Sequence, residues 1–184
     1  MFRWLKWSII VLVLLVAAAA GGGLWLKSYV APSEKLDLAY DPVSIEDKAL
    51  QMVANLKPEI VLSEADVNNL IKSQLQGGHS ASLPPDMKLD GARFELSGDR
   101  LIAHLNMTYR DFLPVGMLAT YKMSWKAPNL IIEPVSLTVK DYDLGKERLD
   151  RMVVPIQLPS MISIRDMQFQ SNQIVIGLKL SIRL

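Results

Sequence analysis

Carboxylates and histidines are the side chains in this sequence that could perform chemistry, and they are sparse. Asp141 and Asp143 are spaced to share one face of a strand, and with Glu147 or Asp150 they could bind a cation or act as an acid–base pair. Basic side chains surround these acids, which favours a solvated turn: Lys140, Lys146, Arg148 and Arg151.

The histidines offer no better candidate. His79 follows two glycines in an expected loop, and His104 is on the polar face of an expected strand. The chain has no cysteine, which excludes disulfides, thiolate catalysis and Cys-ligated zinc. It also has no G-x-S-x-G, H-E-x-x-H or P-loop motif. We therefore predict no catalytic residue, no cofactor and no metal site; a hydrolase with two carboxylates is the alternative that stays open.

An uncharged apolar run, Ser8 to Leu26, precedes all of these groups. As a helix it spans about 28 Å, close to the hydrocarbon thickness of a bilayer. Arg3 and Lys6 come before the run, whereas the first acid, Glu34, comes after it. Aromatic residues bracket the run at both ends: Trp4, Trp7, Trp25 and Tyr29. These features predict a single-pass anchor in the cell membrane with its N-terminus in the cytoplasm.

The sequence divides into a transmembrane anchor at residues 1–27, a polar linker at 28–43 and one extracytoplasmic domain at 44–184. The small residues from Ala17 to Gly23 leave a cleaved signal peptide as the alternative to an anchor. The apolar residues Leu24 to Leu26 favour retention, because they extend the segment beyond a usual signal core.

The charge of the expected domain is nearly balanced. The chain has 20 Lys and Arg and 19 Asp and Glu, and three of the cations, Arg3, Lys6 and Lys27, flank the apolar run. Because nucleic-acid binding depends on an excess of basic side chains, the sequence predicts no nucleic-acid partner.

Two segments carry the signals of short amphipathic helices. Ser44 with Asp47 resembles a capping box, and an apolar stripe follows until a proline ends the segment. Ser63 with Asp66 repeats this pattern before a second stripe that stops at Gly77. The stripes consist of Ala49, Met52, Val53 and Leu56 in the first segment and Val67, Leu70, Ile71 and Leu75 in the second.

After the second helix the apolar period changes to two, which is typical of strands with one buried face. The clearest runs are Leu101–Arg110, Val115–Lys126 and Ile174–Leu184. The alternation changes phase near Gly91 and near Arg165, as a β-bulge would cause. We expect an α+β domain in which two short amphipathic helices pack on a curved antiparallel sheet of about five or six strands.

The connections are also predicted. Ser97-Gly98-Asp99, Ala127-Pro128-Asn129 and Ser171-Asn172 are typical hairpin turns. Ile60 to Leu62 favours a brief extended segment between the two helices, and Leu144 to Arg151 a short third helix.

Methionines are frequent on the expected inner face of the sheet. Because thioether side chains adapt to irregular apolar ligands, their number indicates a groove for an acyl chain, although each one could simply fill the core. The expected lining residues are Met87, Leu105, Met107, Met117, Tyr121, Met123, Trp125 and Leu178.

Several short motifs resemble a known family. They are I-V-L-S-E-A-D-V-N-N-L-I-K at Ile60 to Lys72, F-L-P-V-G-M at Phe112 to Met117, V-S-L-T-V at Val135 to Val139 and V-P-I-Q-L-P at Val154 to Pro159. Together they resemble the YpmS family of small bacterial proteins, which have an N-terminal membrane anchor and an extracytoplasmic domain of unknown function. The resemblance implies the localisation and the order of helix and sheet, and it implies no catalytic residues.

Two functions remain as expectations. In the first, the domain binds a lipid or another apolar molecule of the cell envelope between its sheet and its helices. In the second, the helices fill the core completely, and a partner protein of the envelope docks on a sheet edge or a polar face.

Overall fold

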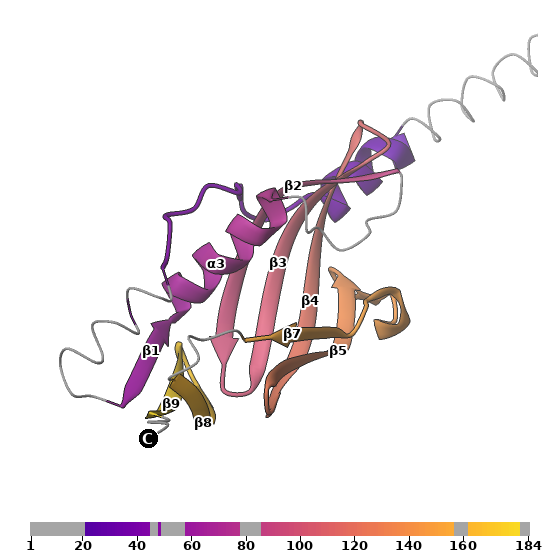
Figure 1. Cartoon of the computed structure of the whole chain (residues 1–184). Coiled ribbons are helices and arrows are strands. Elements are labelled where there is room, and N and C mark those ends of the chain that lie inside the picture. The colour runs from indigo at the N-terminus through magenta and orange to yellow at the C-terminus, as the bar shows by residue number, and fades with distance from the viewer. Residues whose placement is uncertain (1–20, 45–47, 49–57, 78–85, 157–161, 181–184) are drawn as a thin grey trace, which may run out of the picture.

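The computed structural model describes residues 21–44, 48, 58–77, 86–156 and 162–180. It shows a mixed α+β fold in which a curved antiparallel sheet, a smaller antiparallel sheet and a helix pack together (Figure 1). The expected fold class and the antiparallel sheet are therefore confirmed.

Helix α3 (Glu64–Gln76) begins and ends where the sequence predicts. Ser63 is its N-cap, and the Ser63 hydroxyl and the Asp66 carboxylate form a reciprocal capping box. Gly77 forms the C-cap. The other expected amphipathic helix falls outside the described residues, apart from Ser44 and Lys48.

The larger sheet has six strands. Its hydrogen-bonded order is β2-β3-β4-β5-β6, with β7 also paired to β5. The strands are β2 (Met87–Ser97), β3 (Arg100–Tyr109), β4 (Leu113–Lys126), β5 (Asn129–Val139), β6 (Tyr142–Asp143) and β7 (Met152–Pro155). Instead of the short helix expected between β6 and β7, the chain forms a single 3₁₀ turn, Lys146–Arg148.

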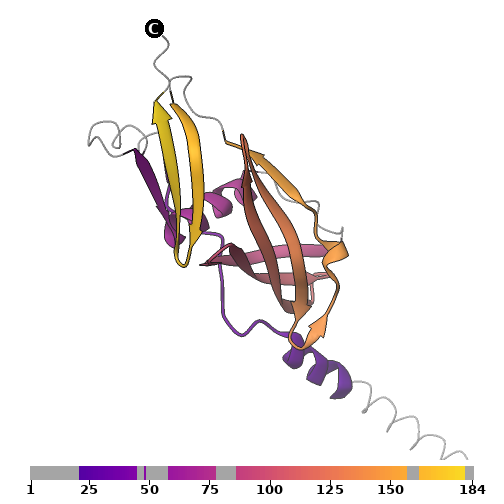
Figure 2. The same cartoon turned by 90° about the horizontal axis from the view of Figure 1, so that it is seen from below.

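A second sheet has three strands in the order β1-β9-β8. Its strands are β1 (Glu59–Ser63), β8 (Ile162–Gln170) and β9 (Gln173–Leu180). The sequence predicted one sheet that included the final strand, whereas the structure pairs that strand with β1, with Ile60 opposite Ile176. The two sheets are seen as separate layers in Figure 2.

β-Bulges bend the long strands. The register shifts between Leu89 and Gly91 in β2 and between Ile164 and Asp166 in β8, which confirms both phase changes seen in the sequence. A third shift leaves Val135 of β5 without a partner on β4. Because a bulge increases local twist, these positions contribute to the curvature of the sheets.

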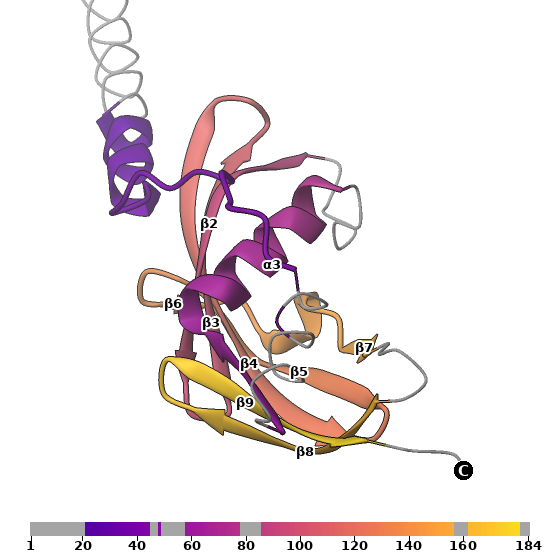
Figure 3. The ribbon, with the colours of Figure 1, turned by 60° about the vertical axis from the view of Figure 1, so that its left-hand side comes forward.

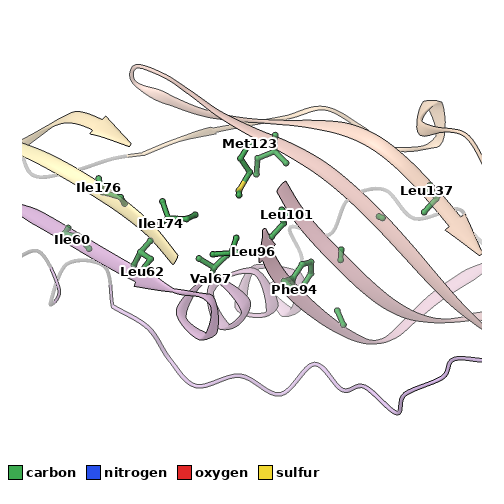
Figure 4. Close-up of a cluster of buried hydrophobic side chains, with 14 of the residues drawn as sticks. Ile60, Leu62, Val67, Phe94, Leu96, Leu101, Met123, Leu137, Ile174 and Ile176 are labelled. Carbon is green, nitrogen blue, oxygen red and sulfur yellow. The ribbon is translucent and has the colours of Figure 1, made fainter. Parts of the chain in front are cut away.

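One apolar core joins the two sheets. Side chains from β1, α3, β2, β3, β4, β5 and β9 converge in it (Figure 4). Met123 and Leu178 are members of this core, and Leu105 and Met117 pack against it. Although Leu178 comes from the smaller sheet, these four residues share one packed region.

The chain preceding the domain is attached to it. Residues 21–30 form a helix, and residues 31–44 then run across the domain toward α3 (Figure 3). Most of the expected transmembrane anchor, residues 1–20, lies outside the described residues. Among the residues that are described, no helix has both the length and the apolar character needed to cross a membrane.

Candidate apolar binding site

Helix α3 and the β6–β7 connection border one face of the larger sheet. In Figure 1, α3 lies over the β2–β3 side of the sheet, and β7 is paired with β5 on the other side of β4. Apolar side chains from these segments pack against the core and remain partly exposed. We call this set the inner-face residues: Leu70, Ile71 and Leu75 from α3; Leu105, Met117 and Tyr121 from β3 and β4; and Leu144, Leu149 and Met152 from the β6–β7 connection.

The eight residues that the sequence proposed for a groove differ in their burial and in whether they pack against the core. Met107, Met123 and Leu178 are each only 3% exposed. Their side chains fill the interior of the protein, as the alternative interpretation of the methionines expected. A ligand could contact them only after a rearrangement of the core.

Leu105, Met117 and Tyr121 are the proposed residues that pack against the core and keep exposed surface. Leu105 and Met117 lie directly opposite each other on β3 and β4, and Leu101 is the partner of Tyr121. Since β4 keeps its alternation, Met117 and Tyr121 point to the same face of the sheet.

Met87 and Trp125 are half-buried but do not belong to the core or to the side chains packed on it. Met87 is the first residue of β2, beyond the bulge at Asp90, and it pairs with Tyr109. Trp125 pairs with Leu130 near the β4–β5 turn. The structure thus separates both residues from Met117.

The sequence predicted that Leu144 to Arg151 adds a short third helix to the cover of the sheet, whereas the structure forms only a 3₁₀ turn there, Lys146–Arg148. Leu144 and Leu149 lie in an irregular segment without helical or strand period, and Met152 begins β7. The signal in the sequence of this segment was that isolated apolar residues lie among charged ones. Leu144 is placed by a backbone hydrogen bond from its N–H to the carbonyl of Leu137, 2.8 Å long.

Tyr121 supplies a polar group to this apolar face. Burial, and secondarily the charge of Asp150, raise the pKa of the Tyr121 phenol. The phenol is therefore protonated at neutral pH and can donate a hydrogen bond. An apolar surface with one donor can hold and orient an amphipathic molecule.

The carboxylates that could have formed a hydrolytic pair are engaged in local structure. Asp141 accepts a hydrogen bond from the Tyr29 hydroxyl at 2.9 Å, and Asp143 accepts one from the Gly145 N–H at 2.8 Å. No group of three or more His, Asp or Glu side chains in the described part of the chain could hold a metal ion.

His104 is not among the inner-face residues. His79 is outside the described residues. His104 Nε2 is 3.4 Å from a Glu95 carboxylate oxygen, and that nitrogen has no hydrogen-bond partner. Burial and the neighbouring Arg93 lower the pKa of His104.

Comparisons with known proteins give no relative. No model of a protein family matches the chain, and no curated protein or solved structure matches it. The resemblance to the YpmS family therefore stays a prediction from the short motifs.

Proposed function

We propose that the domain is a non-enzymatic, membrane-anchored module that binds an acyl chain of an envelope lipid along its inner-face residues. The observation that carries this proposal is the set of partly exposed apolar side chains that pack against the core from α3, β3, β4 and residues 144–152: Leu70, Ile71, Leu75, Leu105, Met117, Tyr121, Leu144, Leu149 and Met152. Covering such a surface gains about 25 cal/mol per Å² of apolar area, so a bound chain would be stabilised by contact alone.

A lipid is the occupant that fits the rest of the chain best. The uncharged run from Ser8 to Leu26 supports the expected anchor, which would hold the domain beside a bilayer. The protonated Tyr121 phenol could donate a hydrogen bond to an ester or phosphate oxygen of the headgroup. The methionine at the centre of the face, Met117, adapts to chains of different shape.

Native mass spectrometry of the full chain, extracted in detergent from its source membrane, tests this proposal. We expect a bound lipid that is lost when Met117 is replaced by tryptophan, because the larger ring occupies the inner face. Met87→Trp is the matched control, because Met87 lies outside the core and the side chains that cover it. Lipids that associate with the anchor are common to both variants, so the difference between them reports on the domain.

Equal lipid occupancy in Met117→Trp and in the unchanged chain would contradict the proposal, provided that circular dichroism shows the fold retained. A second substitution is Ile71→Trp on α3, which approaches the same face from the opposite side. Loss of lipid in both variants, with the control unchanged, would locate the ligand between α3 and β4.

The edge of the larger sheet supports a second candidate function, the docking of an envelope protein. Val153 and Val154 of β7 are 50% and 41% exposed, and β7 pairs only with β5 among the described strands. An edge strand with exposed valines can accept an added strand. Val153→Lys separates the two candidates, because it would impair docking on β7 and leave lipid occupancy unchanged.

A further inference from the structure

Large exposed apolar side chains gather at the end of the domain that adjoins the N-terminal helix. Leu24, Trp25 and Leu26 are 71%, 66% and 47% exposed on the helix of residues 21–30. Phe112, in the β3–β4 turn, is 63% exposed, and Tyr142, at the start of β6, is 65% exposed. We call these five residues the anchor-proximal surface.

Contacts of Tyr29 hold the helix against the β5–β6 turn. The Tyr29 hydroxyl donates to Asp141 Oδ2 at 2.9 Å, and its ring meets Tyr142 edge-on with centroids 6.4 Å apart. Trp25 stacks on the other side of Tyr29 at 5.2 Å. The hydrogen bond to Asp141 raises the pKa of the Tyr29 phenol. Trp25 and Tyr142 are thereby kept on one side of the molecule.

The β3–β4 hairpin reaches the same end. Its tip lies beside the helix of residues 21–30 in two different views (Figures 1 and 3). A Cβ on Gly116, three residues into β4, would lie 2.8 Å from the Cα of Pro32, so the chain leaving the helix touches this hairpin. Arg110 and Asp111 have positive φ angles of 49° and 61°, which form the tight turn that presents Phe112.

We infer that the anchor-proximal surface lies in the headgroup region of the bilayer, so that Phe112 and Tyr142 form a second membrane contact beside the anchor. Aromatic rings prefer this region, and a cluster of exposed apolar side chains marks an interaction site. A bilayer is the occupant because the uncharged run from Ser8 leads directly into the helix that carries Leu24, Trp25 and Leu26.

The charges around this surface indicate the kind of membrane contact. Lys27 lies on the helix of residues 21–30, Arg110 and Lys140 lie in the two turns, and Asp111 and Asp141 follow the turn bases directly in the sequence. Arg110 is also paired with Asp86 at 3.3 Å. Because acids offset these bases, the contact depends on the aromatic side chains and needs no anionic lipid.

Single cysteine labels provide the test, because the natural chain has no cysteine. We would place an environment-sensitive fluorophore at Phe112→Cys in the full chain, reconstituted in phosphatidylcholine vesicles that contain a doxyl-labelled lipid quencher. Val61→Cys is the matched control: Val61 is 47% exposed and lies on β1, at the opposite end of the domain. Leu24→Cys reports whether the anchor itself has inserted.

We expect strong quenching at positions 24 and 112 and weak quenching at position 61. The quenching at 112 should not change when anionic phosphatidylglycerol is added. Quenching at 24 but not at 112 would overturn the inference and leave the anchor in place. Equal quenching at 112 and 61 would also overturn it, since the domain would then have no preferred end. Neither result depends on whether the inner-face residues bind a lipid.

Discussion

Asp66 connects three groups at the start of α3 through one charged oxygen. Its Oδ2 accepts hydrogen bonds from the Ser63 N–H at 2.9 Å, the Ser63 hydroxyl at 2.8 Å and Lys48 Nζ at 2.9 Å. Burial raises the pKa of Asp66, but the hydrogen bonds from Lys48 and Ser63 outweigh burial, and the pKa falls below its usual value of 3.8. The fold therefore favours the ionised carboxylate.

This shift predicts a pH dependence of stability. A carboxylate whose pKa is lower in the folded chain stabilises the fold above its unfolded pKa of 3.8, and this contribution is lost as the pH falls through the folded pKa. We expect Asp66→Asn to lower the free energy of unfolding near neutral pH by about 0.5–1.5 kcal/mol, the usual net contribution of a hydrogen bond, and by much less at acidic pH.

Urea unfolding of the detergent-solubilised chain, followed by circular dichroism at both pH values, measures this difference. The control is Asp111→Asn, at an exposed turn position where asparagine accepts the positive φ angle. A loss that is the same at neutral and acidic pH would contradict the role of the Asp66 charge.

At the scale of elements, the free edge of β2 is closed by side chains of α3. The Phe94 N–H donates to Asn68 Oδ1 at 3.0 Å, and the Leu96 N–H donates to Glu64 Oε2 at 2.8 Å. The Ala92 N–H donates to the Asp37 carbonyl at 3.1 Å. Alternate amides of the edge strand thus have partners outside the sheet, which leaves them unavailable for pairing with another strand.

Removing one of these partners tests the closure of the edge. We expect Glu64→Ala to lower the free energy of unfolding by about 1–3 kcal/mol, because the amide of the buried Leu96 loses its acceptor. Glu64→Gln keeps a carbonyl oxygen at the same place, so it should cost less than about 1 kcal/mol. Hydrogen exchange at Leu96 should accelerate only in the alanine variant, and equal exchange in both variants would show that Glu64 does not protect this amide.

Local patterns in the sequence were sufficient to predict where individual helices and strands lie. The capping box at Ser63 located α3, and alternation located β3, β4 and β9 to within a few residues. The bulges at Asp90 and Arg165 were visible because polar residues interrupt the alternation there. The bulge at Val135 was missed, because Ile131 and Ile132 are both apolar and hide the change of phase.

Local patterns in the sequence could not predict which strands pair with each other. β1 and β9 are more than a hundred positions apart, and nothing in either strand specifies the other. For the same reason the sequence could predict methionines on an inner face but not how deeply each is buried. Met117 stays partly exposed, whereas Met107 and Met123 are buried. Burial depends on which elements cover each position, and β7 and the smaller sheet supply part of that cover.

At the scale of the whole molecule, residues 36–40 join the N-terminal helix to the domain as a fixed strap. Lys72 is buried, and its Nζ donates to the Ala39 carbonyl at 3.1 Å and lies 3.4 Å from Asp37. Gln76 donates to the Leu38 carbonyl at 2.8 Å. With the Ala92 bond to Asp37, these contacts hold the strap between α3 and β2. The strap therefore fixes the domain's orientation relative to the helix of residues 21–30.

Gly91 is the position at which this arrangement is most easily broken. A Cβ there would collide with the Leu36 carbonyl and lie 2.7 Å from the Asp37 nitrogen, so the backbone of the strap must move when a side chain is added. We expect Gly91→Ala to loosen the strap while the core stays folded.

Lys35 is the only trypsin site between Ser28 and Ser44, so its cleavage reports on the strap directly. Trypsin should release a fragment that begins at Leu36 several times faster from Gly91→Ala than from the unchanged chain. Gly23→Ala is the control, because a Cβ at Gly23 meets no atom within 4 Å. If Lys35 is cut at the same rate in both variants, the packing at Gly91 does not hold residues 36–40 in place.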